Sequence, residues 1–316
     1  MNELDQITAG AREQTLVQAL HQGRVDPDRM DHHLLPFFVK LQIQTTSYCN
    51  AACVTCPYPE AAETQSMGRM SEELFERIVD QITGRGVERT SLFLMNEPLV
   101  DKRLEAFTAH LKDREPDTKA TIITNGTLLD GSRARSLAAA GMDDISVSVN
   151  GFTAHDYEST MVGLDFARIQ QNLDEVGTAR QDGELGTMAV RIVTLDIGDA
   201  RQHAEAFHAR TGLAVYMKPV TNRAGSVDTS TFDSQTSCGS QPKPCQRPFV
   251  KAYVLFDGTM LLCNCDWQRT TVIGSVAETT LEELWHGPVL DTIRRNHLVG
   301  LPADSLCAKC DYPYLI

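Results

Sequence analysis

The chain has 316 residues, of which 42% are hydrophobic and 22% are charged. This length predicts one large α/β domain with a small addition, and the composition excludes disordered, collagen-like and coiled-coil proteins. Asp and Glu number 42 against 29 Lys and Arg, and the net charge of −13 disfavours nucleic-acid partners and would attract a cationic substrate. The sequence contains no apolar run of membrane-spanning length and no secretion signal, so we expect a cytoplasmic protein with free thiols.

Alternating patterns along the chain predict the fold class. Residues 1–36 are expected to form a helical extension, with a helix near residues 13–20. Six β-branched or apolar runs then predict strands at 41–45, 91–95, 121–124, 145–149, 190–193 and 214–217. Helical periodicity lies between them at 74–82, behind Ser71 as N-cap, and at 103–111, 133–140, 166–178 and 200–210. Repeated β/α units predict parallel strands, in a doubly wound or barrel-like sheet with its chemistry at the carboxyl ends of the strands.

The nine cysteines fall into two groups separated by a long stretch without cysteine. The first group, Cys49, Cys53 and Cys56, follows the first predicted strand directly and therefore lies at the expected catalytic end. A closed zinc site needs four ligands, and no fourth Cys or His is nearby in the sequence. Three thiolates at this spacing can hold three corners of an iron–sulfur cube and leave one iron open to a substrate or cofactor.

This Cys-x3-Cys-x2-Cys loop, after the first strand of a six-unit β/α chain, resembles the radical S-adenosylmethionine (SAM) superfamily. The resemblance covers residues 38–220 and implies a partial (β/α)6 TIM-like barrel in which the open iron binds the amino and carboxylate groups of SAM. The Asn96-Glu97-Pro98 turn is similar to the family's Gly-Gly-Glu-Pro turn, which gives Glu97 the role of binding the SAM amino group. Asn96 departs from that pattern by replacing the second glycine.

Three further residues enter through the same resemblance. Asn125 belongs to a segment similar to the family's Thr-Asn-Gly, and Ser148 and Arg191 resemble the polar residues that contact the ribose and carboxylate of SAM. Each has an ordinary alternative: Asn125 in a common turn, and Ser148 and Arg191 as polar strand residues. The family's aromatic residue before the third cysteine is absent, since Thr55 stands there, and Tyr58 is the nearest candidate to replace it.

The second cysteine group predicts a separate small module. Residues 221–244 are polar and aperiodic and are expected to be a linker between the barrel, 37–220, and a C-terminal domain, 245–316. In that domain, apolar runs at 252–256 and 260–263 flank Asp257-Gly258, a hairpin signal, and a helix begins near Leu281. So small a unit needs a metal staple. The candidate ligands are Cys245, Cys263, Cys307 and Cys310.

This arrangement resembles the Twitch form of the SPASM extension, which implies one auxiliary 4Fe-4S cluster, with a zinc ion on the same ligands as the alternative. Cys238 and Cys265 are left over. Cys265 would lie beside the cluster, as a hydrogen donor to the substrate, a buried spectator or a replacement for Cys263.

Taken together, the resemblances imply an enzyme that uses SAM and two 4Fe-4S clusters, with an electron donor such as flavodoxin or ferredoxin. A 5′-deoxyadenosyl radical would remove hydrogen from a small aminoglycoside or sugar-like molecule in antibiotic biosynthesis. We expect epimerisation with Cys265 as catalytic hydrogen donor. The alternatives are an alcohol dehydrogenase that uses the auxiliary cluster as electron acceptor, and a peptide maturase.

Overall fold

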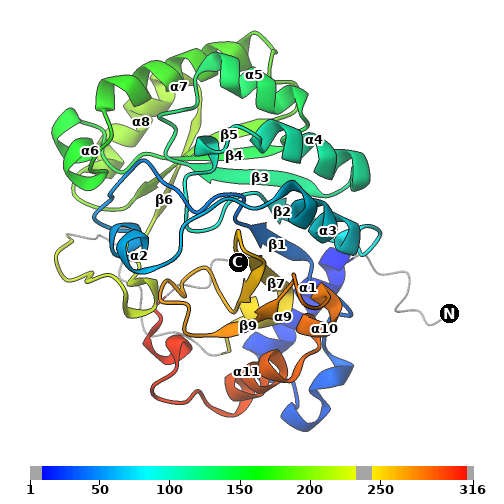
Figure 1. Ribbon diagram of the computed structural model, residues 1–316. Coiled ribbons are helices and arrows are strands. Elements are labelled where there is room, and N and C mark those ends of the chain that lie inside the picture. Colours follow the sequence, from blue (N-terminus) through cyan, green and yellow to red (C-terminus); the bar gives the residue numbers. More distant parts are fainter. Residues whose placement is uncertain (1–8, 233–243, 312–316) are drawn as a thin grey trace.

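The computed structural model describes residues 9–232 and 244–311, and its centre is one parallel sheet (Figure 1). The strands are β1 (Lys40–Ile43), β2 (Arg89–Ser91), β3 (Lys119–Thr124), β4 (Asp144–Ser148), β5 (Ala189–Leu195) and β6 (Ala214–Lys218). They lie side by side in the order β6-β5-β4-β3-β2-β1, and each neighbouring pair is parallel. This arrangement confirms the predicted α/β partial barrel.

Helices fill the connections between the strands. The crossover helices are α3 (Glu72–Ile82), α4 (Leu104–Arg114), α5 (Gly131–Ala139), α7 (Phe166–Gln181) and α8 (Ala200–Thr211). In Figure 1, α4, α5, α7 and α8 form an arc on the outer side of β3 to β6. Two short helices, α2 (Tyr58–Thr64) and α6 (Ala154–Thr160), follow the carboxyl ends of β1 and β4. Because the six strands are parallel, their carboxyl ends all lie at one edge of the sheet.

The second strand is shorter than predicted and lies earlier in the chain. The run 91–95 predicts a strand, but β2 ends at Ser91. The side chain of Asn96 accepts a hydrogen bond from the Leu94 amide at 2.7 Å, and Met95 has a φ of 56°. A local side-chain bond and a left-handed residue both turn the chain out of extended geometry, so this part of the prediction is wrong.

The C-terminal strands continue the same sheet. β7 (Lys251–Val254) pairs in parallel with β1, with Leu41 opposite Ala252. The antiparallel strands β8 (Thr259–Leu261) and β9 (Val272–Ser275) follow, which confirms the predicted hairpin and adds a strand that the sequence did not predict. The 245–311 segment is therefore joined to the barrel by a nine-stranded sheet. The predicted boundaries of the domains stay predictions.

The N-terminal and C-terminal segments pack on each other below this junction. Helix α1 (Ala9–His21) covers the predicted helix, and its Leu20 shares a core cluster with Phe249 of α9 (Arg247–Val250). The C-terminal helices are α10 (Leu281–Trp285) and α11 (Pro288–Val299). Fully buried Arg294 lies over the Trp285 ring and donates to the carbonyls of Pro248 and Trp285 at 2.9 and 2.8 Å. Within the described residues, no helix is both long and apolar enough to cross a bilayer.

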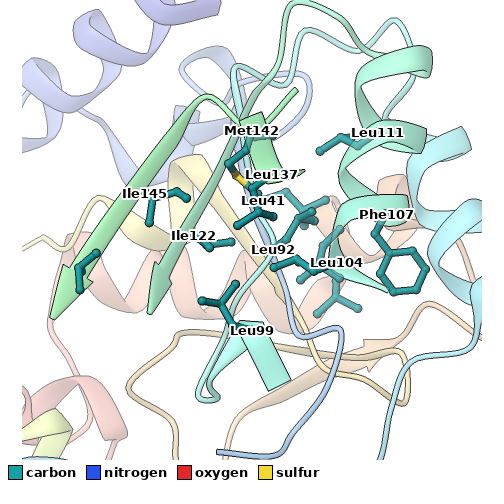
Figure 2. Packing of buried hydrophobic residues seen from close by; sticks show 14 of the residues in the cluster. Leu41, Leu92, Leu99, Leu104, Phe107, Leu111, Ile122, Leu137, Met142 and Ile145 are labelled. Carbon is teal, nitrogen blue, oxygen red and sulfur yellow. The ribbon is translucent and has the colours of Figure 1, made fainter. Parts of the chain in front are cut away.

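The main core lies between the sheet and the crossover helices. Helix α3 begins where the Ser71 hydroxyl accepts from the Leu74 amide, and it buries Phe75, Ile78, Val79 and Ile82. The Phe75 ring stacks on Phe107 of α4 at a centroid distance of 4.2 Å. Figure 2 shows Leu104, Phe107 and Leu111 of α4 on one side of this cluster and the strand residues Ile122 and Ile145 on the other. This packing fixes the strand ends that carry the functional side chains.

The substitution Phe75→Ala tests this core. Removal of a buried ring that stacks on Phe107 should lower the free energy of unfolding by about 3 to 5 kcal/mol, measured by urea denaturation. The matched change at the exposed neighbour, Glu76→Ala, should lower it by no more than about 0.5 kcal/mol. Equal effects of the two substitutions would contradict the described packing.

Candidate active site

A cavity of about 400 Å³ lies at the carboxyl ends of the strands. It brings together six of the residues that the sequence singled out, from the loops after β1, β2 and β3 and from the end of β4. They are Cys49, Cys53, Cys56, Glu97, Asn125 and Ser148. Tyr58, the aromatic residue considered in place of Thr55, also lines the cavity.

The loop that carries the first three thiols is held by backbone hydrogen bonds. The amides of Ala52 and Val54 donate to the carbonyls of Val162 and Thr160 at 2.8 and 3.0 Å. The Cys49 amide donates to the Tyr58 hydroxyl at 2.8 Å. The loop is therefore fixed on the α6 side and at its own start before any ligand binds.

The Glu97 carboxylate ties the strand ends together. It is 2% exposed and accepts three hydrogen bonds, from the Thr124 hydroxyl at 2.6 Å and from the amides of Asn125 and Leu99 at 2.7 and 3.0 Å. The Glu97 amide in turn donates to the Tyr48 carbonyl at 3.1 Å, next to Cys49. Burial raises the pKa of Glu97 to about 7 although these hydrogen bonds oppose the shift.

Asn125 links this turn to the cysteine loop. Its side-chain amide donates to the Asn50 side chain at 2.7 Å, and Asn50 donates to Thr127 at 3.1 Å. The next residue, Gly126, has a φ of 77°, and an added Cβ would lie 2.5 Å from Val147 and 2.6 Å from Ile169. The Asn-Gly pair is thus more than a surface turn, since only glycine fits this position and Asn125 bonds to the residue that follows Cys49.

Ser148 and Arg191 differ in their placement. Ser148 ends β4 and lines the cavity. Arg191 lies on β5 two residues before the cavity-lining Val193, forms an ion pair with Asp144 at the start of β4, and is not among the described residues that line the cavity. The structure therefore brings Ser148 to the site and leaves Arg191 nearer the amino end of the barrel.

The buried thiols are chemically suited to a cationic iron–sulfide core. Burial raises the pKa of Cys49 and of Cys53 to about 12, and it also raises the pKa of Cys56. Thiols bind metals as thiolates, so a bound cation must stabilise the charge that burial disfavours. Among residues 9–232 and 244–311, no three Cys, His, Asp or Glu side chains converge as the ligands of a single ion would. The fit to a cluster rests on the three thiols that share one cavity wall.

The second cysteine group gathers at the junction with β7. Burial raises the pKa of Cys307 to about 12, and Cys245, Cys263 and Cys265 lie close enough to raise it further. Cys310 follows on the same 3-10 turn, where its amide donates to the Cys307 carbonyl at 3.4 Å. The four predicted auxiliary ligands therefore lie on the segments that meet here, while Cys238 lies outside the described residues.

Arg247 connects these thiols to the cavity. It lines the cavity, is 8% exposed, and donates through Nη1 to the Cys263 sulfur at 3.0 Å, the Cys265 sulfur at 3.4 Å and the Asn264 side chain at 2.9 Å. A hydrogen bond with Cys265 and burial raise the pKa of Cys263 well above its usual value. Cys265 is 1% exposed and is not among the described cavity-lining residues, so its thiol faces the other cysteines.

The charge of the lining differs from the charge of the whole chain. Among the described residues, four basic side chains and one carboxylate line the cavity, namely Lys218, Arg223, Arg247, Lys251 and Glu97. This positive lining is opposite to the cationic-substrate preference predicted from the net charge of −13. Sequence reasoning missed all four basic residues, and the only available signals were that Lys218 directly follows a predicted strand and that Arg247 stands two residues after Cys245.

Comparison with known proteins agrees with this geometry. A model of the radical SAM superfamily matches residues 43–202, about half of the chain, and a model of the SPASM iron–sulfur cluster-binding domain matches residues 245–311. The chain belongs to the radical SAM superfamily and carries a SPASM domain, which confirms both resemblances. These domains identify SAM and 4Fe-4S clusters, one of them auxiliary, as its cofactors.

Among individual proteins, the chain is 22% identical to an S-adenosyl-L-methionine-dependent 2-deoxy-scyllo-inosamine dehydrogenase of Niallia circulans over 87% of this chain and 93% of that protein. Its fold is similar to the crystal structure of BtrN with AdoMet and 2-DOIA, at 20% identity and a TM-score of 0.60 over 87% of this chain and 94% of that one. It is also similar to SuiB of Streptococcus suis bound to its precursor peptide SuiA, at 16% identity and a TM-score of 0.69 over 89% and 71%.

The contacts of Arg247 generate a prediction about the auxiliary cluster. Arg247 donates to Cys263, a predicted ligand of the auxiliary cluster. A positive hydrogen-bond donor on a ligand sulfur stabilises the reduced, more negative cluster, so Arg247→Met should lower the reduction potential of that cluster. We expect a change of at least about tenfold in the reduction equilibrium, or roughly 59 mV for one electron. The measurement is an EPR-monitored redox titration in a background with Cys49, Cys53 and Cys56 changed to Ala, so that only the auxiliary cluster is observed.

The control variant Arg247→Lys retains the charge and should restore part of the potential. An auxiliary cluster with the same potential in the wild-type, Met and Lys proteins would show that Arg247 has no electrostatic influence on it.

Proposed function

We propose that the chain is a radical SAM dehydrogenase that oxidises a hydroxyl-bearing carbon of a small, sugar-like molecule. The observation that carries the proposal is the single cavity that joins the Cys49 loop to the Arg247 contact with the auxiliary cysteines. Support also comes from the inosamine dehydrogenase, which the chain matches over nearly its full length. Together, SAM and the first cluster supply a one-electron cleavage that yields a hydrogen-abstracting 5′-deoxyadenosyl group.

In this proposal the residues of the chain hold the two clusters, SAM and the substrate. Cys49, Cys53 and Cys56 ligate the first cluster, and Glu97 accepts from the SAM amino group beside Asn125 and Ser148. Arg191 stays a proposed SAM contact that would require movement toward the cavity. Loss of one hydrogen atom, one proton and one electron from the alcohol gives a carbonyl. Cys245, Cys263, Cys307 and Cys310 would hold the auxiliary cluster, which would supply an acceptor for that electron.

Oxidation of the alcohol would release one electron for each electron used in SAM cleavage, so a small flavodoxin or ferredoxin would supply the first electron and accept the released one. Epimerisation, which we expected from the sequence, needs a hydrogen donor that reaches the substrate. Cys265 is buried among the other cysteines and engaged with Arg247 rather than exposed in the cavity. This placement favours oxidation over hydrogen return.

The Glu97→Gln substitution tests the SAM site. The change removes the negative charge and gives the position a donor that meets the Asn125 amide, which also donates. A lost charge-assisted hydrogen bond costs roughly 1.5 to 3 kcal/mol, so SAM affinity should fall by at least about tenfold. Equilibrium dialysis of labelled SAM against the reconstituted protein measures this, and the exposed Glu76→Gln serves as the control. Unchanged affinity would refute the assignment of Glu97.

Product analysis in deuterium oxide tests the reaction. Polyols and amino sugars, 2-deoxy-scyllo-inosamine among them, would be screened anaerobically for those that increase 5′-deoxyadenosine formation. A dehydrogenase yields a product with two hydrogens fewer than the substrate and no solvent deuterium on carbon. One molecule of this product should form for each 5′-deoxyadenosine. Cys265→Ser should leave this ratio unchanged.

The opposite result is equally clear. A product with as many hydrogens as the substrate, one of them replaced by deuterium on carbon, would establish an epimerase and reject the dehydrogenase. Loss of that product in the Cys265→Ser and Cys265→Ala variants would identify Cys265 as the hydrogen donor.

A further inference from the structure

Lys218 is the last residue of β6 and lines the cavity, where it is half-buried. Its charge has no carboxylate partner within ion-pair distance among the described residues. Its charged neighbours are Arg223 and Arg191, and burial followed by these two cations lowers the pKa of Lys218. An ammonium group that is partly removed from water and surrounded by cations is destabilised until an anion joins it.

The other three cations of the lining each have a thiol nearby. Arg247 donates to the sulfurs of Cys263 and Cys265. Lys251 lies close enough to Cys263 for the two to affect each other, and Arg223 lies close enough to Cys56 to lower its pKa. When these cysteines bind clusters as thiolates, three of the four positive charges gain a negative neighbour.

Among residues 9–232 and 244–311, no thiol or carboxylate is placed beside Lys218 in the same way. The one carboxylate in the described lining, Glu97, is not among the charged groups that act on Lys218, and in the proposed function it binds the SAM amino group. A bound anion would supply the negative charge that the described residues do not place beside Lys218.

Uncharged polar side chains in the same lining indicate what else that molecule carries. Asn96, Asn150 and Thr194 line the cavity together with Lys218. Amide groups and hydroxyls both donate to and accept from ligand hydroxyl groups, so such a lining suits a hydroxylated molecule.

We propose that the substrate is a polyhydroxylated molecule with a carboxylate or phosphate group, and that Lys218 binds this anionic group. The inference rests on the proposed function, since it concerns the substrate of that same cavity, and it replaces the amino-sugar preference with an anionic one. Lys218 then selects the substrate and takes no part in SAM binding.

Calorimetric titration of the SAM-bound, anaerobically reconstituted protein tests this with three probes on one hexose frame: D-glucuronate, D-glucose 6-phosphate and D-glucosamine. At least one anionic sugar should bind about tenfold more tightly than glucosamine. Lys218→Met should abolish the difference, and Lys218→Arg should preserve it. Lys119→Met, at an exposed position on β3, is the control and should behave as wild type. A preference for glucuronate or for the phosphate identifies which anion is used.

Three results would overturn the inference: glucosamine binding as tightly as both anions, no measurable binding of either anion, or a preference that survives in Lys218→Met. Weaker SAM binding in Lys218→Met with an intact sugar preference would assign Lys218 to the SAM carboxylate and also reject it. The titration involves no turnover, so a protein that cleaves SAM but prefers glucosamine disproves this inference alone.

Discussion

The buried carboxylate of Glu97 holds together the ends of β1, β2 and β3 on which the site is built. It receives the Thr124 hydroxyl and the Asn125 amide from the end of β3, while its own backbone amide reaches the carbonyl that precedes Cys49. Hydrogen bonds to a buried carboxylate are strong because little water competes for them. The position of the three thiols therefore depends on a residue in the loop after β2, as well as on the cysteine loop itself.

The parallel pairing of β7 with β1 explains how two cysteine groups far apart in sequence serve one cavity. β1 is followed by the Cys49 loop, and β7 is preceded by Cys245 and Arg247. Because β1 pairs with β7, with Leu41 opposite Ala252, the barrel and the SPASM segment share one sheet and both contribute residues to the lining of the cavity. The route from the cavity to the auxiliary cysteines thus passes through Arg247, which contacts both.

Local patterns predicted much of this arrangement, and long-range contacts account for the rest. The β-branched runs indicated β1 and β3 to β6, and the spacing of Cys49, Cys53 and Cys56 indicated a cluster loop. The early end of β2 depends on the Asn96 side chain, which no period of hydrophobicity reveals. The contact of Arg247 with Cys263 and the position of Lys218 beside Arg191 and Arg223 both depend on residues that are brought together only by folding. The net charge of the chain was a poor guide to the charge of the cavity lining, because exposed carboxylates dominate the net charge.

The central claim is that the Cys49 loop holds a cluster whose fourth iron binds SAM. EPR and hyperfine spectroscopy of the reduced protein, with Cys263 and Cys307 changed to Ala to remove the auxiliary signal, test it most directly. The account predicts a cluster signal that shifts when SAM is added and broadens when the SAM carboxylate carries oxygen-17. A cluster signal that is unaffected by SAM, or a loop that binds no iron, would contradict it.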